Sequence, residues 1–344
     1  MKAADCTPCN LAEAAEALES GLLVAFPTET VYGLGADAEN PEAVARIYEA
    51  KGRPSDHPVI VHLAPGADLS YWAKDIPDAA LQLSEAFWPG PLTLILKRAD
   101  HIPDAVSGGQ DTVGLRCPSH PVAQELLKSF KAGRGGIAAP SANKFGRVSP
   151  TKAEHVIEEF EQELGPGGLI ASVLDGGQSD VGIESTIIDL SRLSTHGPVL
   201  LRPGHISVDQ LSAVLGVVPA MPDAAAPRAS GTLESHYAPR TPVILVSPDE
   251  LDQVVSVLES KGKTIALMSC QSHPELNAKA WTQLPTDPAG YAFGLYAGLR
   301  ELDQANADLI LVEQLPSDAA WQGVNDRLRR AAFDSRHELG EWLS

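Results

Sequence analysis

Hydrophobic and polar positions change their period repeatedly along the first 130 residues, which predicts alternating helices and strands. Apolar residues recur at helical spacing between Asn10, a plausible N-cap, and Gly21, and again between Pro41 and Gly52. The segment between these helices begins with a short apolar strand and continues as a predicted loop at 27–40. Further helices are predicted at 78–88 and 120–130, and strands at 22–26, 59–63 and 92–97.

The pattern continues less regularly to about residue 207. It predicts a helix at 151–164 and extended segments at 136–139, 185–190 and 198–202. Helices and strands do not follow a strict β-α-β rhythm, which favours an α/β fold with a twisted sheet of mixed strand direction.

Near residue 217 the composition shifts to a stretch rich in Pro, Ala and Ser without a period, typical of a linker. Beyond it, apolar strands alternate with helical patterns, as in a small parallel, doubly wound, Rossmann-like domain. We therefore predict a first domain at 1–207, a linker and possible active-site lid at 208–241, and a second, smaller α/β domain at 242–344. Its strands are expected at 243–246, 264–269 and 307–313, and its helices at 248–262 and 287–306.

Charge narrows the class of ligand. The chain has 344 residues and a formal net charge of −19, so its surface repels phosphate backbones, and extensive nucleic-acid binding requires the basic residues to gather in one cleft. No apolar run is long enough to span a membrane, and the first residues lack the apolar stretch of a signal peptide. We expect a cytoplasmic protein without a membrane contact.

Two short motifs suggest chemistry that their context does not favour. Cys6 and Cys9 form a CxxC without a second pair, so unused, reduced cysteines are the preferred interpretation over a metal site. The stretch "GLGADA" imitates a dinucleotide fingerprint, but "PTETVY" separates it from the preceding strand and the next helix starts only at Pro41. A P-loop is absent from the sequence.

The segment "KGRPSDHP" carries Lys51, Arg53 and His57 just after a predicted helix. Alone, it is more typical of a basic helix end that interacts with the helix dipole. Arg116 and Arg202, however, each end a predicted strand beside a proline, and ligands of open α/β folds lie at strand ends. Together these cations indicate an anion site.

Small polar side chains accompany the cations. "APSANKFGRVSPT" places Ser141, Asn143 and Ser149 before a predicted helix start near Thr151, where free backbone N–H groups can bind phosphate. "FPTETVYGL" and "GIESTIIDL" add Thr28, Glu29, Thr30, Ser185 and Thr186 beside strands. For the first segment, turn formation and helix capping are the alternative explanation. For the other two, the alternative is that strands tolerate these hydroxyls without any contact to a ligand.

Taken in order, these segments resemble a known family. "FPTETVYGLGADA", "KGRPSDHPVIVHL", "FWPGPLTLIL", "VGLRCPSHP", "APSANKFGRVSPT", "GIESTIIDL" and "LLRPGHI" are similar to motifs of the threonylcarbamoyl-AMP synthases, the YrdC-like family. The linker "SHYAPRTP" and the last domain resemble its long, two-domain form. The resemblance covers nearly the whole chain and includes the Lys-x-Arg and Ser-x-Asn signature.

The resemblance implies an enzyme that converts L-threonine, bicarbonate (or CO2) and ATP, with Mg2+, into threonylcarbamoyl-AMP and pyrophosphate. A separate transferase complex then modifies a tRNA adenosine next to the anticodon, and direct tRNA binding by this chain is expected to be weak or absent. A carbamate supplies its own nucleophile, so the chemistry requires positioned cations rather than a catalytic triad.

Site residues follow from the same resemblance, position by position. Lys51, Arg53, Ser141 and Asn143 form the catalytic signature, and no protein metal ligand is expected. The threonine side is lined by Thr30, His62, Arg116, Ala139 and Ser185. The ATP side is lined by Arg53, His57, Thr112, Ser141, Ser149 and Arg202, with His236 and Tyr237 from the linker.

The chain departs from the family pattern at two places. Position 57 is His where Asn is commoner, which makes a contact there sensitive to pH. The linker before "HYAP" is less basic than in some members. Two alternatives stay open: a carbamoyl-transfer protein that uses carbamoyl phosphate, although the acylphosphatase and zinc-finger segments of such proteins are missing, and a noncatalytic RNA-binding module.

Overall fold

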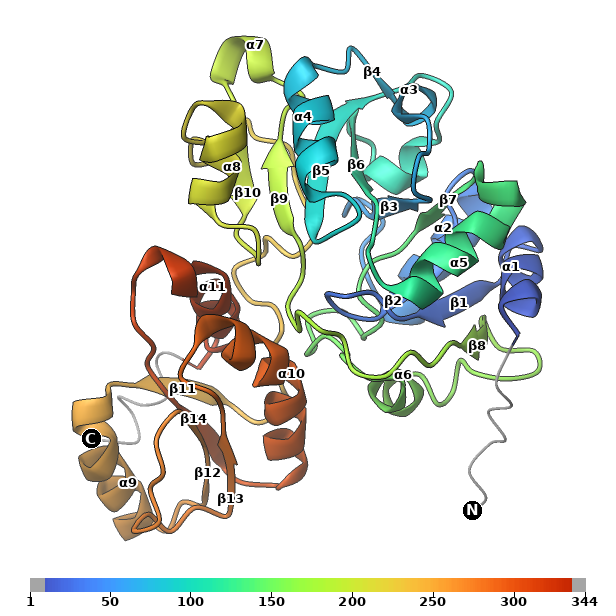
Figure 1. Cartoon of the computed structure of the whole chain (residues 1–344). Helices are drawn as coiled ribbons and strands as arrows, with labels where there is room; N and C mark the ends of the chain where they lie inside the picture. Colours follow the sequence, from blue (N-terminus) through green and yellow to red (C-terminus); the bar gives the residue numbers. More distant parts are fainter. Residues whose placement is uncertain (1–9, 336–344) are drawn as a thin grey trace. The chain divides into compact units, whose positions relative to one another are not determined.

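The computed structural model describes residues 10–335, which form two compact units (Figure 1). The first unit contains the chain up to Phe145 and the range Pro150–Thr232. The second contains the range from Leu233 onward together with the short segment Gly146–Ser149. The boundary between the units thus lies inside the predicted linker.

The first unit is built from the elements that the periodicity outlines, with several short additions. Its helices are α1 (Leu11–Glu19), α2 (Pro41–Lys51), α3 (Leu69–Trp72), α4 (Asp78–Phe87), α5 (Pro121–Ser129), α6 (Ala153–Glu159), α7 (Leu193–His196) and α8 (Val208–Leu215), with 3-10 turns at Asp104–Ser107 and Phe130–Gly133. Its strands are β1 (Leu23–Phe26), β2 (Gly33–Asp37), β3 (Ile60–Leu63), β4 (Ala73–Lys74), β5 (Leu92–Arg98), β6 (Thr112–Arg116), β7 (Gly136–Ala138), β8 (Ile170–Val173), β9 (Thr186–Asp189) and β10 (Val199–Arg202).

These strands form one 10-stranded sheet in the order β10-β9-β5-β6-β3-β7-β2-β1-β8, with β4 paired to β5. The pairs β3–β6, β5–β9 and β1–β8 are parallel, and the other pairs are antiparallel. The predicted mixed sheet is confirmed.

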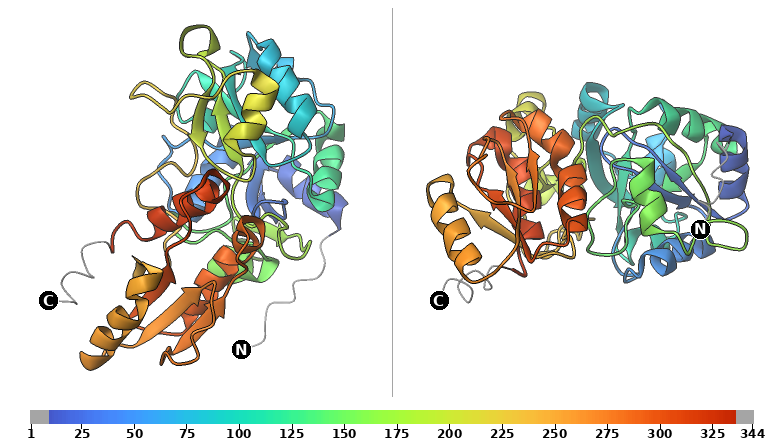
Figure 2. Two further views of the ribbon diagram at one scale, coloured as in Figure 1. Left: turned by 60° about the vertical axis from the view of Figure 1, so that its left-hand side comes forward. Right: turned by 90° about the horizontal axis from the view of Figure 1, so that it is seen from below.

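Strand alternation gives this sheet two differently covered faces. Side chains such as Leu23 and Ala25 belong to the large core, whereas Val24 and Phe26 point to the other face and pack with residues of α1 and α5. Helices α1 and α5, blue and green in Figures 1 and 2, lie side by side there. A smaller apolar cluster on the same face comprises Ile60, Ile95, Ile187, Val199 and Leu201, with linker residues Ala226 and Ala229 against it.

Three sequence predictions need correction. The loop predicted at 27–40 contains β2, and Gly35 is required there because a Cβ would lie 2.8 Å from side-chain atoms of Phe26 and Ile137. Gly33 and Gly35 lie within this strand rather than at a strand-to-helix turn, which agrees with the preference against a dinucleotide fingerprint in "GLGADA". The helix predicted at 151–164 covers only Ala153–Glu159, and the start of the predicted linker is the helix α8.

The second unit contains a parallel four-stranded sheet in the order β11-β14-β12-β13. Helix α9 packs on one face with the cluster around Leu267, and α10 lies on the other, where Gly298 approaches Met268. The doubly wound prediction is confirmed. The elements are β11 (Val243–Val246), α9 (Leu251–Ser260), β12 (Ile265–Ser269), β13 (Ala280–Gln283), α10 (Pro288–Gln304), β14 (Leu309–Glu313) and α11 (Gln322–Ala331), with 3-10 turns at Pro248–Glu250 and Ala319–Trp321.

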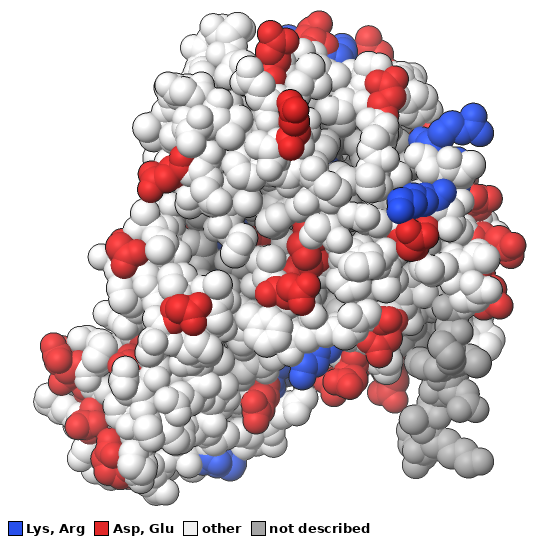
Figure 3. Space-filling view, in the orientation of Figure 1, with Lys and Arg blue, Asp and Glu red and all other residues white. Residues whose placement is uncertain are grey.

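Acidic side chains are spread over the face of the protein shown in Figure 3, as the net charge of −19 predicts. None of the helices between residues 10 and 335 combines the length and apolar character needed to cross a bilayer. Cys117 and Cys270 are free thiols, while Cys6 and Cys9 lie outside the described residues.

Candidate active site

Predicted site residues that belong to strands of the first unit lie on the face of the sheet opposite the large core. In β6, Val113 and Leu115 point into the core, so Thr112 and Arg116 must point the other way. The same alternation places His62 in β3 on this face. Polar side chains that are distant in sequence are therefore brought together by strand pairing.

Arg116 is the centre of the predicted threonine side. Its side chain is only 5% exposed, and its Nη1 donates to the Thr30 hydroxyl at 2.9 Å. Its Nη2 lies 2.7 Å from Oε1 of Glu29, which is equally buried. Nε and Nη2 of Arg116 and Oε1 of Glu29 nevertheless lack a hydrogen-bond partner in the described part of the chain, since the ion pair does not have hydrogen-bond geometry.

His62 lies beside Arg116, because the two residues are Cα partners in the β3–β6 pair. Burial and the positive charge of Arg116 lower the pKa of His62 to about 3, so the imidazole is neutral near pH 7. Its Nδ1 is buried and has no hydrogen-bond partner among the described residues. Ala139 directly follows β7, the antiparallel neighbour of β3, and its N–H donates to the Ile60 carbonyl of β3 at 2.9 Å.

Ser185 connects the predicted threonine side to the predicted ATP side. Its hydroxyl lies 2.7 Å from the hydroxyl of Thr93, a polar residue of β5 that faces away from the core. Arg202 donates from Nη2 to this hydroxyl at 3.1 Å and from Nε to the Ser185 carbonyl at 3.0 Å. Arg202 Nη1 donates to the Ser230 carbonyl of the linker at 2.7 Å.

Lys51 holds the Ser-x-Asn segment in place. Asn40 caps α2 at its start, and Gly52 ends it with a φ of 62°, as predicted. The buried Lys51 ammonium donates to the Ser141 carbonyl at 2.6 Å and also to the Asn143 carbonyl. Burial and the charge of Arg53 lower the pKa of Lys51 well below its ordinary range. The ammonium thus binds backbone oxygens here, rather than pointing freely into a cavity.

Arg53 and His57 lie on the loop that follows α2. Arg53 Nη2 donates to the Pro58 carbonyl at 2.8 Å, and the His57 ring meets the Phe145 ring edge-on at 5.4 Å. Burial and then the Arg53 charge lower the pKa of His57. Asp56 is the nearest carboxylate, 3.9 Å from His57 Nε2.

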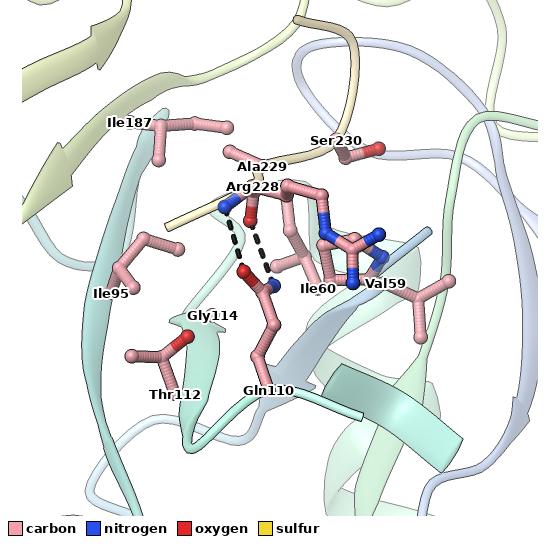
Figure 4. Close-up of a pocket in the computed structure, with 11 residues that line it drawn as sticks. Val59, Ile60, Ile95, Gln110, Thr112, Gly114, Ile187, Arg228, Ala229 and Ser230 are labelled. Atoms are coloured by element: carbon pink, nitrogen blue, oxygen red, sulfur yellow. Dashed lines mark hydrogen bonds between the residues drawn. The ribbon is translucent and has the colours of Figure 1, made fainter. Parts of the chain in front are cut away.

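A small pocket lies beside Thr112, between the sheet and residues 228–230 of the linker (Figure 4). Gln110 holds the linker over it: its amide exchanges hydrogen bonds of 2.7 and 3.1 Å with the backbone of Arg228. The Arg228 side chain forms an ion pair with Asp56 at 2.9 Å. The pocket is lined by Pro58, Val59, Ile60, Ile95, Gln110, Thr112, Gly114, Ile187, Arg228, Ala229 and Ser230.

Three predicted ATP contacts, Ser149, His236 and Tyr237, belong to the second unit and are described with it. Tyr237 is buried with a φ of 62°, which is uncommon for a residue other than glycine. The Arg327 guanidinium lies 5.6 Å from the centre of its ring, and the His236 ring lies 4.1 Å away. Packing inside this unit therefore fixes the orientation of the "HY" pair.

Two residues of the site were not among the predicted contacts. In the sequence, Glu29 is only a neighbour of Thr28 and Thr30, because its ion-pair partner Arg116 lies in the distant strand β6. Thr93 could have been found from the sequence. It is a polar residue that alternates with the apolar Leu92, Leu94 and Leu96 of the same strand, so it must face away from the core. Among residues 10–335, only Asp252, His273 and Glu275, in the second unit, lie close enough together to offer three metal ligands.

Comparisons with known proteins agree with this architecture. A family model described as telomere recombination, of Sua5, YciO and YrdC, matches residues 16–204, and the model of the threonylcarbamoyl-AMP synthase C-terminal domain matches residues 206–333. A threonylcarbamoyl-AMP synthase of Pyrococcus abyssi is 39% identical over 93% of both chains. That of Bacillus subtilis is 38% identical over 94% of this chain and 93% of its own.

Among solved structures, the crystal structure of Pyrococcus abyssi Sua5 complexed with L-threonine superposes with a TM-score of 0.85 at 37% identity and covers 94% of each chain. Both units are included in matches of this extent. The chain therefore belongs to the threonylcarbamoyl-AMP synthase family, in its two-domain form.

Proposed function

We propose that the site in the first unit makes threonylcarbamoyl-AMP, with pyrophosphate and water, from L-threonine, bicarbonate and ATP. The observation that carries this proposal is the group of buried polar atoms around Arg116 that lack a hydrogen-bond partner among the described residues. Buried polar groups without partners are costly, so a polar ligand is expected to complete them. L-Threonine is the ligand named for the related archaeal structure.

The proposed reaction requires positioning and charge stabilisation. The threonine carbamate oxygen attacks the α-phosphorus of ATP, and pyrophosphate leaves from the opposite side. Arg53 and Arg202 neutralise the phosphate charge, while Lys51 keeps the Ser141–Asn143 segment in the conformation that presents its polar groups. Exclusion of water by the buried sheet face protects the carbamate.

Mg2+ fits this site only as a companion of ATP. The described residues of the first unit contain no group of three metal-ligating side chains, so phosphate oxygens and water would supply its ligands. When bound, Mg2+ would neutralise charge on the triphosphate. The positions of Arg53 and Arg202 do not depend on it.

The product is an activated acyl-adenylate, so we infer that it passes to a tRNA threonylcarbamoyl transferase complex that modifies the adenosine next to the anticodon. The acidic surface supports little direct affinity of this chain for tRNA. Both the transfer and the weak tRNA contact are parts of the proposal.

One assay tests the proposed reaction against the alternatives. Pyrophosphate release from ATP is measured with and without L-threonine and with and without bicarbonate. We expect release only when both are present with ATP and Mg2+. A carbamoyl-transfer protein would instead require carbamoyl phosphate, and an RNA-binding module would release no pyrophosphate. Release that ignores threonine would contradict the proposal.

A further inference from the structure

Glu29 is a buried carboxylate that the predicted ligand contacts leave without a role. Its backbone is fixed on both sides: the Thr28 hydroxyl donates to the Val31 carbonyl at 2.6 Å, and the Glu29 carbonyl accepts from Val181 N–H at 2.7 Å. Its Oε2 accepts from Ser119 N–H at 3.1 Å. The position of this carboxylate is therefore set by the surrounding chain before any ligand binds.

Its other oxygen, Oε1, takes part in an ion pair but accepts no hydrogen bond from the described residues. It lies 2.7 Å from Arg116 Nη2, yet both atoms lack a hydrogen bond of proper geometry in the described residues. An anionic and a cationic group thus lie side by side at a buried position, each with hydrogen-bonding capacity left over. Purely structural pairs in proteins normally fill this capacity, because an unmade buried hydrogen bond is costly.

The charges around this pair favour one class of ligand. Arg116 alone would attract any anion, including the phosphates of ATP. Glu29 cancels that attraction, and the neighbouring His62, neutral because its pKa is lowered to about 3, restores none of it. A molecule with one carboxylate and one ammonium satisfies both partners, whereas a phosphate meets the Glu29 carboxylate with repulsion.

We propose that Glu29 is a specificity-determining residue that binds the ammonium group of the amino acid whose carboxylate binds Arg116, and so selects a zwitterion over an anion. The proposal rests on the proposed function and names how its amino-acid site discriminates. The amine must lose its proton before it attacks CO2. The contact with Glu29 therefore acts in substrate binding, and its loss changes KM more than kcat.

Calorimetric titration of the full chain tests this proposal with two ligands. L-Threonine has both charges, whereas 2,3-dihydroxybutanoate has a hydroxyl in place of the ammonium. We expect the unaltered protein to bind threonine roughly 10- to 100-fold more tightly than the hydroxy acid, the range of one charge-assisted hydrogen bond. In Glu29→Gln, the affinity for threonine should fall by about this factor and that for the hydroxy acid should not, so the ratio approaches one.

A merely structural Glu29 gives a different result. If it only orients Arg116, both ligands lose affinity equally in Glu29→Gln and the ratio stays constant, which overturns the proposal. The matched control is Asp189→Asn, a buried carboxylate at the far end of β9 that pairs with Arg192, and it should leave the ratio unchanged.

The test survives a folding defect. If Glu29→Gln does not fold, the affinities of the unaltered protein still test the proposal, because similar affinities for threonine and the hydroxy acid would contradict it. Glu29→Asp, which keeps the charge, should retain part of the preference for threonine. Pyrophosphate release is read separately: selective threonine binding without release would contradict the proposed reaction and leave the role of Glu29 intact.

Discussion

Two buried arginine clusters, one in each unit, differ in how completely their charges are satisfied. In the second unit, the Asp326 carboxylate accepts from Arg330 Nε at 2.9 Å and lies 3.3 Å from Arg327 Nη1. In the first unit, Arg116 and Glu29 lie 2.7 Å apart and retain unfilled hydrogen-bonding atoms. Among the described residues, the cluster of the second unit is therefore complete without a ligand, whereas the Arg116–Glu29 pair of the first unit is not.

This difference separates two uses of a buried charge. Asp326 holds Arg327, whose guanidinium lies over the Tyr237 ring. Burial acts to raise the pKa of Asp326, but the charges of Arg327 and Arg330 outweigh burial and lower this pKa below its ordinary value. Arg116 is left with donors for an outside group. A buried ion pair alone is thus weak evidence of a binding site, whereas a buried pair with unsatisfied atoms is informative.

The largest expected effect is on the satisfied cluster. Asp326→Ala leaves two buried arginines without their carboxylate, so the free energy of unfolding of the second unit should fall by about 3–5 kcal/mol. Urea denaturation of the full chain, followed by circular dichroism, measures it. A loss below about 1 kcal/mol would show that the cluster is not the structural pair described here.

The unsatisfied cluster should respond in activity. Arg116→Met keeps much of the side-chain volume but removes the donors, so threonine-dependent pyrophosphate release should fall by about 100- to 1,000-fold. Stability should change less than in Asp326→Ala. The control is Arg192→Met, whose guanidinium pairs with Asp189 and Asp223 away from the site. Equal activity of the two variants would erase the distinction between the clusters.

His62 predicts a pH dependence of stability in the first unit. Its pKa is about 3 in the folded protein against an ordinary 6.5, so below pH 6.5 the unfolded chain binds a proton that the folded protein excludes. Stability should therefore fall as the pH decreases from about 6.5 to 3, by about 1.4 kcal/mol per pH unit from this residue. His62→Gln should make the unfolding midpoint less dependent on pH in this window. The same slope in both proteins would contradict the assignment.

The smallest expected effect concerns the linker. The Arg228–Asp56 pair is about half exposed, so its loss should cost under about 1 kcal/mol. Arg228→Ala should raise the KM for ATP a few-fold, since the segment over the pocket beside Thr112 is then held less firmly. Steady-state kinetics at two salt concentrations measure it. The control is Lys97→Ala, which breaks an exposed pair with Asp75 and should leave the KM for ATP unchanged at both salt concentrations.

Much of the fold could be predicted from local patterns. The capped helix from Pro41 to Lys51 and the apolar strands have signals contained in a few neighbouring residues. Strand β2 could not be predicted in this way. In the sequence, its Gly35 is typical of a turn. Glycine is required there because Phe26 and Ile137 crowd the position, and this crowding arises only after the strands pair.

The same limit applies to the site. Arg116 and Arg202 could be predicted because each ends a strand, a position readable in the sequence. The importance of Glu29, which lies in the bend between β1 and β2, depends on its partner Arg116 in β6, and a single sequence does not reveal this pairing. That the Lys51 ammonium binds two backbone carbonyls, rather than pointing freely toward an anion, likewise appears only once the Ser141–Asn143 segment is folded against it.

The short segment Gly146–Ser149 has a consequence for dissecting the protein. It groups with the second unit, where the Gly146 carbonyl accepts from Ala238 N–H at 3.0 Å and the Val148 carbonyl accepts from Arg300 at 2.5 Å. The chain therefore passes from one unit to the other three times, after Phe145, Ser149 and Thr232. A truncation at Thr232 would strip these carbonyls of their donors inside the loop that follows the Ser-x-Asn signature. Contacts divide the structure into two units, but no single truncation point in the sequence separates them.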